Sequence, residues 1–342
     1  MPNATAVEIQ RKLAPLSKDS PDCGGLHLAL AQNTDSLDRL IGCNYRSLVF
    51  VPRHPGWTFK NPSISLNPSG GYYCAVRYSS WPMVKGFASH SELIIATLND
   101  EFETVNVKYV PQLTRPIAAP YYSSFGPEDA RLFRVYDQWF ATATFRDLPE
   151  CRATPEFFCC MGLMSLDADF NWTNLTVLPS PVVQDEKNWM PIVGELAWLY
   201  SPFNTLRCWI NPQTKKLSYA PPVWTPPELK FTRGGTHIVP INEDYALGVV
   251  HETVLHVPNS LYRQHGYHRA YMHRFVLWRR DPFCVAAFSP PFHFLTQCSV
   301  EFAAGLALKD GKLLISFGHH DNASWVAEVQ LADVQRILQP AQ

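Results

Sequence analysis

One stretch near the middle of the chain carries two adjacent carboxylates and a guanidinium. Glu128 and Asp129 follow Gly126-Pro127, and Arg131 lies two residues further on. Two neighbouring carboxylates resist ionising together, and a nearby cation holds one of them charged, so that their pKa values can separate. Such a separation suits general acid/base catalysis. The alternative is that Asp129 caps a turn and Arg131 forms an ordinary surface ion pair.

Polar side chains recur at similar places relative to the other strand-like segments. The recurring residues are Asn61, Arg77, Lys187, Asn188, Arg233, Thr236, His237, His251, His319, His320 and Asp321. If each segment delivers its residues to one cavity, they form a polar ring that suits a sugar with many hydroxyl groups. For His251 the alternative is a core histidine with satisfied hydrogen bonds, and for Lys187 it is a solvated turn.

The histidines lack the spacing of a metal site. Nine of the twelve lie between His237 and His320, but no two are four residues apart. The adjacent pair His319-His320 would point to opposite sides of a strand. Cys-x-x-Cys spacing and the glycine-rich nucleotide motifs are also absent. The sequence therefore predicts no metal and no cofactor, although Arg233-Gly234-Gly235 can present backbone N–H groups to a phosphate.

The elements that must position these residues are short strands. Hydrophobic residues make up 46% of the 342-residue chain and charged residues 17%, while 29 prolines and 17 glycines punctuate the apolar runs. The strand candidates fall into five groups, and the fuller groups span roughly 50 residues, a cadence typical of propeller blades. We therefore predict an all-β, five-bladed β-propeller over residues 46–330, with a β-sandwich as the alternative.

Short segments flank the predicted propeller. Residues 1–45 are expected to form an N-terminal arm with some helix, and residues 331–342 a helical tail. The N-terminus has no basic region followed by an apolar one, and no apolar run is long enough to span a bilayer. We therefore expect a cytoplasmic protein with no integral membrane segment and with reduced, buried cysteines. The net charge of −1 predicts no nucleic-acid partner.

With these motifs in order, the chain resembles glycoside hydrolase family 130 over about residues 45–330. This family contains inverting β-mannoside phosphorylases and hydrolases, with related mannosyltransferases, and its members are five-bladed β-propellers. Asn61-Pro62 followed by Arg77 resembles the Asn-Pro and Arg of the family's first blade. The stretch from Glu128 to Arg131 is similar to its Glu-Asp-Pro-Arg, with Ala130 in place of proline. The resemblance implies that Asp129 is the general acid.

Three further segments carry the resemblance. Lys187-Asn188 is similar to the family's third-blade Lys element, and Val250-His251 to its Tyr-His. The segment from Phe317 to Asp321 is similar to its Tyr-Gly-x-x-Asp, in which the Asp holds the sugar of the donor subsite. One departure matters, because Ser201 occupies the place of the arginine that grips inorganic phosphate in the phosphorylases.

The resemblance and this departure favour a glycosyltransferase. The expected reaction moves a mannose-like sugar from a nucleotide sugar or a sugar phosphate to a hydroxyl acceptor. The alternatives are an inverting β-mannoside phosphorylase or hydrolase, and a non-catalytic carbohydrate-binding propeller. Asp129 is the predicted catalytic residue. The predicted substrate-binding residues are Asn61, Arg77, Glu128, Arg131, Lys187, Asn188, Arg233, His237, His251 and Asp321.

Overall fold

The computed structural model describes ten parts of the chain. They are residues 29–80, 89–111, 124–146, 148, 159–179, 186–202, 206–211, 216–220, 224–255 and 269–341. Within these parts the strands form five sheets, and the helices are few and short. The predicted all-β propeller fold with few helices is confirmed.

The first three sheets are antiparallel meanders, in which strands that follow one another in sequence also pair in space. The first contains β3 (Trp57–Leu66), β4 (Tyr72–Ser80), β5 (Ser89–Leu98) and β6 (Thr104–Tyr109), with β7 (Ser124–Phe125) parallel to β5. The second contains β8 (Glu128–Val135), β9 (Gln138–Phe145), β10 (Cys160–Leu166) and β11 (Trp172–Leu178). The third contains β12 (Met190–Pro191), β13 (Ala197–Ser201), β14 (Leu206–Ile210) and β15 (Leu217–Tyr219).

The two remaining sheets draw strands from both ends of the described chain. One contains β16 (Thr232–Arg233), β17 (Val239–Pro240), β18 (Tyr245–Leu255), β19 (Arg269–Arg280), β20 (Phe283–Phe288), β21 (Phe292–His293), β1 (Asp35–Ser36) and β25 (Gln339–Pro340). The other contains β22 (Glu301–Lys309), β23 (Lys312–His319), β24 (Ala323–Gln330) and β2 (Asn44–Leu48). Because β2 pairs with β24 in antiparallel register, an early strand completes the last sheet.

The predicted number of five blades is corrected by the fourth sheet in chain order. Four sheets are regular blades of four or five strands, whereas this one has eight. The two-residue strands β21 and β25 pair with β19 and β20, and β1 pairs with β21. These pairings satisfy backbone groups that an exposed strand edge would leave open.

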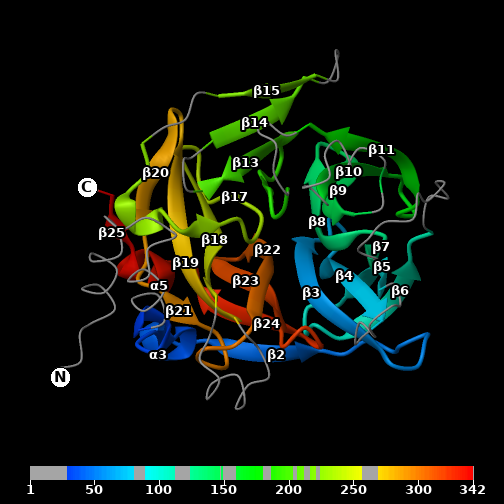
Figure 1. Cartoon of the computed structure of the whole chain (residues 1–342), viewed down its shortest axis with the longest axis horizontal. Helices are drawn as coiled ribbons and strands as arrows, with labels where there is room; N and C mark the ends of the chain where they lie inside the picture. The colour runs from blue at the N-terminus through cyan, green and yellow to red at the C-terminus, as the bar shows by residue number, and fades with distance from the viewer. Residues whose placement is uncertain are drawn as a thin grey trace.

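The sheets are arranged around a common centre (Figure 1). In this view β3, β8, β18 and β22 lie nearest the middle. Contacts between inner strands agree with the picture, because β3 touches both β8 and β22, β8 touches β12, and β18 touches β22. The inner strands of neighbouring sheets are thereby brought together.

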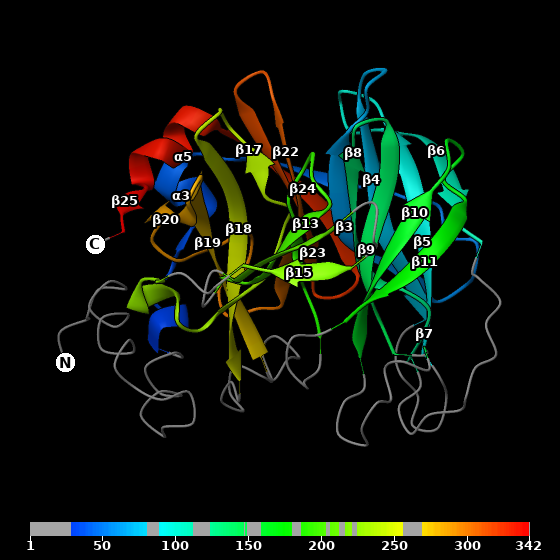
Figure 2. The same ribbon diagram turned by 90° about the horizontal axis from the view of Figure 1, so that it is seen from above.

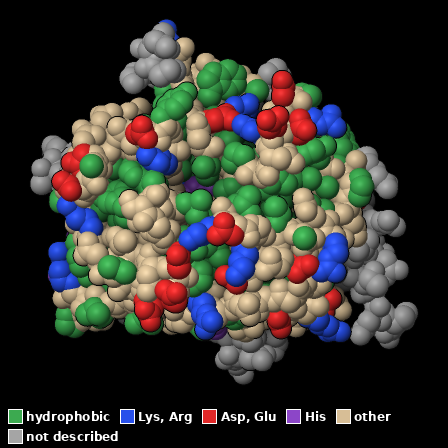
Figure 3. Space-filling view, turned by 180° about the vertical axis from the view of Figure 1, so that it is seen from behind, with side chains coloured by type: hydrophobic (Ala, Val, Ile, Leu, Met, Phe, Trp, Pro, Cys, Tyr) green, Lys and Arg blue, Asp and Glu red, His purple; other side chains and the backbone are tan. Residues whose placement is uncertain are grey.

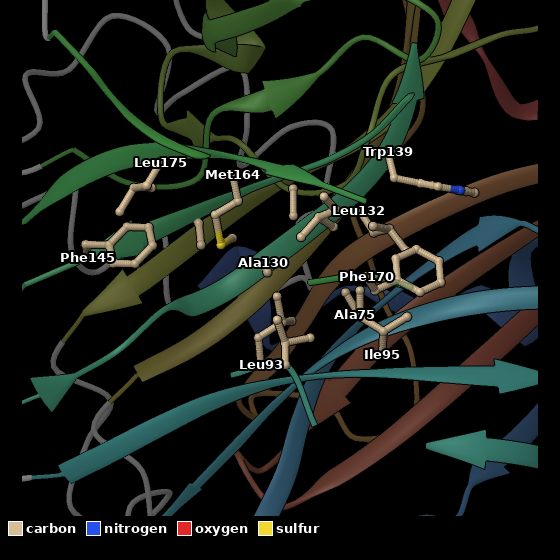
Figure 4. Close-up of a cluster of buried hydrophobic side chains, with 14 of the residues drawn as sticks. Ala75, Leu93, Ile95, Ala130, Leu132, Trp139, Phe145, Met164, Phe170 and Leu175 are labelled. Carbon is tan, nitrogen blue, oxygen red and sulfur yellow. The ribbon is translucent and has the colours of Figure 1, made fainter. Parts of the chain in front are cut away.

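Apolar clusters between neighbouring sheets hold the ring together. Figure 4 shows the cluster between the first two sheets, where Ala75, Leu93 and Ile95 face Ala130 and Leu132. Each of the other neighbouring sheets is joined by a cluster of the same kind. The second and third sheets share Phe133 and Trp198, and the third and fourth share Leu199 and Trp278. The fourth and fifth share Phe275 and Phe317, and the fifth and first share Leu314 and Ile64. Burial of these faces supplies most of the favourable free energy of folding.

Short helices lie at the ends of the described chain. Figure 2 shows α3 (Leu37–Ile41) and α5 (Leu331–Ile337) at the same end of the molecule, where they are in contact. The predicted C-terminal helix is present, but the chain then continues as β25 and joins the fourth sheet. The 3₁₀ helix η3 (Pro227–Leu229) precedes β16. Among the described residues, none of the helices has the length and apolar character needed to cross a bilayer.

The cysteine prediction is only partly correct. Free thiols are found at Cys43, Cys74, Cys159, Cys208, Cys284 and Cys298. Cys160 is disulfide-bonded. Burial raises the pKa of Cys208 to about 12, so that this thiol stays protonated and behaves as an apolar core residue.

Candidate functional site

Three polar residues close to the centre adopt a left-handed backbone. The φ angle is 51° at Asn61, 51° at Asp129 and 59° at Asn188. The strand register shifts between Lys60 and Ser63 in β3, and between Glu128 and Arg131 in β8, as expected for a β-bulge. Asn and Asp tolerate this backbone better than other non-glycine residues. In two neighbouring sheets, a β-bulge with a left-handed residue therefore changes the direction of the side chain, at Asn61 and at Asp129.

A charged residue precedes each of these three left-handed positions. The pairs are Lys60-Asn61, Glu128-Asp129 and Lys187-Asn188. Arg233-Gly234 at β16 is similar in sequence, but the backbone of Gly234 is not left-handed. A Cβ atom on Gly234 would lie 1.8 Å from the carbonyl oxygen of Asn188, so only glycine allows this approach.

The Asp129 carboxylate is oriented by residues of the first sheet. Its Oδ1 atom accepts a hydrogen bond from Asn61 Nδ2 at 2.8 Å and lies 3.3 Å from Arg77 Nη1. The side chain of Asp129 is 19% exposed. Both contacts engage Oδ1, and no described residue hydrogen-bonds to Oδ2. One carboxylate oxygen is thus fixed while the other is available to a bound molecule.

Arg77 connects the two adjacent carboxylates. Its Nη2 atom lies 3.1 Å from Glu128 Oε1, which also contacts Arg146 Nε at 3.2 Å. Burial lowers the pKa of Arg77, but Glu128, Asp129 and Asp321 together raise it above its usual range. Asp321, which follows β23, therefore belongs to the same electrostatic centre.

Lys60 is a member of the centre that sequence reasoning missed. It is only 3% exposed. Burial and the neighbouring Arg77 lower its pKa, while the carboxylates of Asp321, Asp129 and Glu128 act in the opposite direction. The residue that precedes Asn61 thus places a further cation among the three carboxylates.

Asp321 lies on a strained segment beside the first sheet. His320 and Asp321 have φ angles of 55° and 53°. The Asp321 carbonyl oxygen is 3.4 Å from Thr58 Oγ1. A Cβ atom on Gly318 would lie 2.1 Å from Asn61 Oδ1, so the end of β23 packs directly against Asn61. Strained backbone of this kind gathers at functional sites.

Arg131 and His237 are buried away from solvent, although both were predicted to bind substrate. Each is 0% exposed. The His237 ring contacts Ser63 Oγ at 3.4 Å through Nε2 and accepts the backbone N–H of Leu306 at 3.3 Å through Nδ1. Burial, with Arg131 nearby, lowers the pKa of His237 to about 3, so the ring is a neutral part of the core.

His251 is buried, and one of its ring nitrogens lacks a hydrogen-bond partner among the described residues. Its ring packs on Tyr271 and Phe302 at centroid distances of 5.1 and 5.2 Å, and Nδ1 has no partner among the described residues. Burial, with the nearby charges of Arg233 and Arg131, lowers its pKa to about 3. His251 is therefore a neutral hydrogen-bonding group.

The third and fourth sheets contribute exposed cations. Lys187 and Arg233 are both exposed, and Arg233 pairs with His251 across β16 and β18. Glu186 is buried and accepts hydrogen bonds from Trp189 Nε1 at 2.8 Å and Tyr200 Oη at 2.9 Å. These bonds anchor the segment that carries Lys187.

The described residues contain no group of three or more His, Cys, Asp or Glu side chains that could hold a metal ion. On the face seen in Figure 3, acidic and basic side chains are mixed among apolar ones. A basic area of the kind that nucleic acid requires is not visible on that face.

Comparison with known proteins gives a match only at the level of structure. No protein-family model and no curated protein matches the sequence. A β-1,2-mannobiose phosphorylase from Listeria innocua aligns with a TM-score of 0.54 and 14% identity, covering 89% of this chain and 98% of that one. A mannose phosphorylase from Leishmania mexicana in complex with phosphate ion gives 0.51 and 12%, covering 87% and 91%. A GDP-Man-dependent mannosyltransferase from Leishmania mexicana gives 0.51 and 10%, covering 84% and 89%. The chain therefore shares its propeller fold with two mannose-processing phosphorylases and a mannosyltransferase.

Proposed function

We propose that this chain is an enzyme that transfers a mannose-like sugar from a phosphate-activated donor to a hydroxyl acceptor. The observation that carries the proposal is the convergence on Asp129, where Asn61 and Arg77 fix one carboxylate oxygen and leave the other available. The shared fold with a mannosyltransferase and with mannoside phosphorylases supports the same chemistry. In this proposal the eight-stranded sheet acts as the fourth of five blades.

Asp129 is proposed to move the proton. As the new glycosidic bond forms, the acceptor oxygen attacks the anomeric carbon, and its proton passes to the Asp129 carboxylate. The bond between that carbon and the phosphate oxygen breaks, and its electron pair leaves with the phosphate. In the reverse direction the protonated carboxyl group returns the proton to the bridging oxygen. Asn61, Asp321 and Asn188 are proposed to bind sugar hydroxyls.

The phosphate of the donor is proposed to lie between the third and fourth sheets. Lys187 and Arg233 are exposed cations there, and charge-assisted hydrogen bonds to phosphate are strong. His251 adds a neutral ring whose buried Nδ1 atom has no hydrogen-bond partner among the described residues. Arg77, Glu128 and Lys60 set the charge around Asp129, which favours the transition state through preorganised electrostatics.

A phosphorylase acting on β-mannosides is the second candidate. Two of the similar structures are phosphorylases, and one of them was solved in complex with phosphate ion. The exposed Lys187 and Arg233 suit inorganic phosphate as well as the phosphate of a donor. The difference between the two candidates is therefore one of substrate, because the same carboxylate would serve both directions.

A panel of substrates separates the candidates. The purified chain is incubated with GDP-mannose or mannose 1-phosphate plus a mannose acceptor, and separately with β-1,2-mannobiose plus phosphate. Products are followed by anion-exchange chromatography. Turnover of a nucleotide sugar supports the transferase. Release of mannose 1-phosphate from the disaccharide identifies the phosphorylase, and release of free mannose identifies a hydrolase. Sugar binding without any product would contradict both candidates and identify a binding propeller.

The cytoplasmic location of the protein stays a prediction.

A further inference from the structure

Arg131 is a buried cation that ties three segments of the centre together. Its Nη1 atom donates to the carbonyl oxygen of Asp129 at 2.7 Å. Nε and Nη2 donate to the carbonyl oxygen of Gly235 at 3.1 and 3.0 Å, and Nη2 also donates to Asn188 Oδ1 at 3.1 Å. These acceptors lie in β8, before β12 and after β16, so one side chain links parts of three neighbouring sheets.

The partners of this guanidinium are neutral. Among the described residues its hydrogen-bond acceptors are two backbone carbonyls and a side-chain amide. Burying a cation without a hydrogen-bonded carboxylate is costly, and an apolar residue of similar size would avoid that cost. Burial accordingly lowers the pKa of Arg131 to about 10, although the charge of Asp129 opposes this change. An apolar residue could fill the same space, but it could not donate hydrogen bonds to these three acceptors.

Two of the three partners are residues with strained backbone. Asp129 and Asn188 have φ angles of 51° and 59°, in the left-handed region that residues with a side chain rarely adopt. Such a conformation persists where the surrounding structure over-determines it. The bond from Arg131 fixes the peptide that follows Asp129, and hence the direction in which its carboxylate leaves the bulge. The bond to Asn188 Oδ1 leaves Asn188 Nδ2 as the atom available for donation.

We propose that Arg131 is a positioning residue for the Asp129 carboxylate and the Asn188 amide, and that it does not contact the substrate. This replaces the expectation that Arg131 binds phosphate or sugar directly. Its structural part is independent of the reaction, whereas its kinetic consequence rests on the proposed function. A rigid planar fork with several donors is needed, so lysine is not equivalent at this position.

The structural part is tested by crystal structures of Arg131→Met and Arg131→Lys beside the unaltered protein. We expect residue 129 of Arg131→Met to leave its positive φ, and the Asn61–Asp129 contact to lengthen beyond about 3.5 Å, the limit of a hydrogen bond. Retention of the 2.8 Å contact and of the left-handed backbone in both variants would overturn the proposal.

The kinetic part needs a matched control, which Arg274 supplies. This arginine is also buried, at 3% exposure, and bonds to Glu252 Oε1 at 3.1 Å and to the Ser289 carbonyl oxygen at 2.9 Å. It lies on β19, outside the proposed site. With a donor that the unaltered chain turns over, Arg131→Met is expected to lower kcat about 100-fold, as misplacement of a reacting group does, with KM changed less than about threefold.

Arg131→Lys is expected to recover part of this loss, whereas Arg274→Met should lower the melting temperature and leave kcat close to normal. A rise in KM at constant kcat in Arg131→Met would indicate direct substrate contact and overturn the proposal. Equal losses of kcat in Arg274→Met and Arg131→Met would show that the loss comes from general destabilisation, and would overturn the proposal. If the unaltered chain turns over no donor, the proposed function fails, and the crystal structures alone decide the positioning role.

Discussion

The side-chain amide of Asn61 donates a 2.8 Å hydrogen bond to Oδ1 of Asp129, although the two residues are 68 positions apart. Each occupies a bulge on the first strand of its sheet, and each has a φ of 51°. The proposed catalytic carboxylate is therefore oriented across the contact between two sheets. Catalysis by Asp129 should therefore depend on the residues that hold Asn61 and Asp129 in contact.

Removal of the Asn61 amide is expected to weaken catalysis more than folding. Asn61→Gly retains the left-handed backbone but deletes the donor. Since a hydrogen bond to a charged group contributes about 1.5–3 kcal/mol, kcat/KM should fall roughly 10- to 150-fold. Asn61→Ala should show the same loss and a further decrease of about 1 kcal/mol in the free energy of unfolding, measured in urea. Unchanged kcat/KM in Asn61→Gly would show that the amide does not orient Asp129.

A methyl group at Gly318 should disturb the site from the neighbouring sheet. Its Cβ would lie 2.1 Å from Asn61 Oδ1, so Gly318→Ala must displace the Asn61 side chain. Steady-state kinetics should show a decrease in kcat of at least about tenfold. Gly162→Ala is the control, because its Cβ would meet the ring of Phe145 at 2.6 Å inside the apolar core. That variant should lose roughly 1–3 kcal/mol of stability but keep kcat; the reverse order of effects on kcat would argue against the mechanism.

The ion pair between Glu252 and Arg274 should contribute strongly to stability. Its atoms lie 3.1 Å apart, and the two side chains are 1% and 3% exposed. Glu252→Ala leaves a buried cation uncompensated and is expected to cost about 3–5 kcal/mol. The comparison is Glu328→Ala, which removes the partner of Lys312 in a pair that is 21% and 44% exposed and should cost no more than about 1 kcal/mol. Chemical denaturation at neutral pH measures both, and similar losses would contradict the burial argument.

Acid should destabilise the protein partly through His237. Burial lowers its pKa from 6.5 to about 3 in the folded chain. As the pH falls below 6.5, the unfolded state binds a proton that the folded state does not, so the free energy of unfolding decreases by about 1.4 kcal/mol per pH unit until the pH approaches 3. Above pH 6.5 the contribution is fully present. His237→Gln should show a shallower decrease between pH 6 and 4 in urea titrations; an identical slope would exclude this histidine as a source.

Much of the architecture is predictable because the strand pattern and the turn residues act locally. The apolar runs around Tyr72–Ser80 and Lys312–His319 alternate with turns, and these segments are strands in the structure. The extra pairing of the fourth sheet is not predictable in this way. Its added strands β1, β21 and β25 have two residues each, which is too short for any periodicity.

The positions of the site residues are only partly predictable from the sequence. Asn61, Arg77 and Asp129 were expected to meet, and the structure brings them together. Lys60 was missed because a lysine in a strand is ordinarily solvated, and only the closed ring buries it. Arg131 was expected to bind substrate from its place in the Glu128–Arg131 motif, and the motif alone does not show that its side chain is buried against the Asp129 and Gly235 carbonyls.

The most direct test of the central claim compares Asp129→Asn with the unaltered chain, using the donor that the substrate panel identifies. Donor affinity is measured by calorimetry and kcat under saturating donor and acceptor. Because asparagine keeps the shape but cannot exchange a proton, we predict that kcat falls by about 10²- to 10⁴-fold while the dissociation constant of the donor changes less than about threefold. A kcat within about threefold of the unaltered chain would contradict proton transfer by Asp129 and the account built on it.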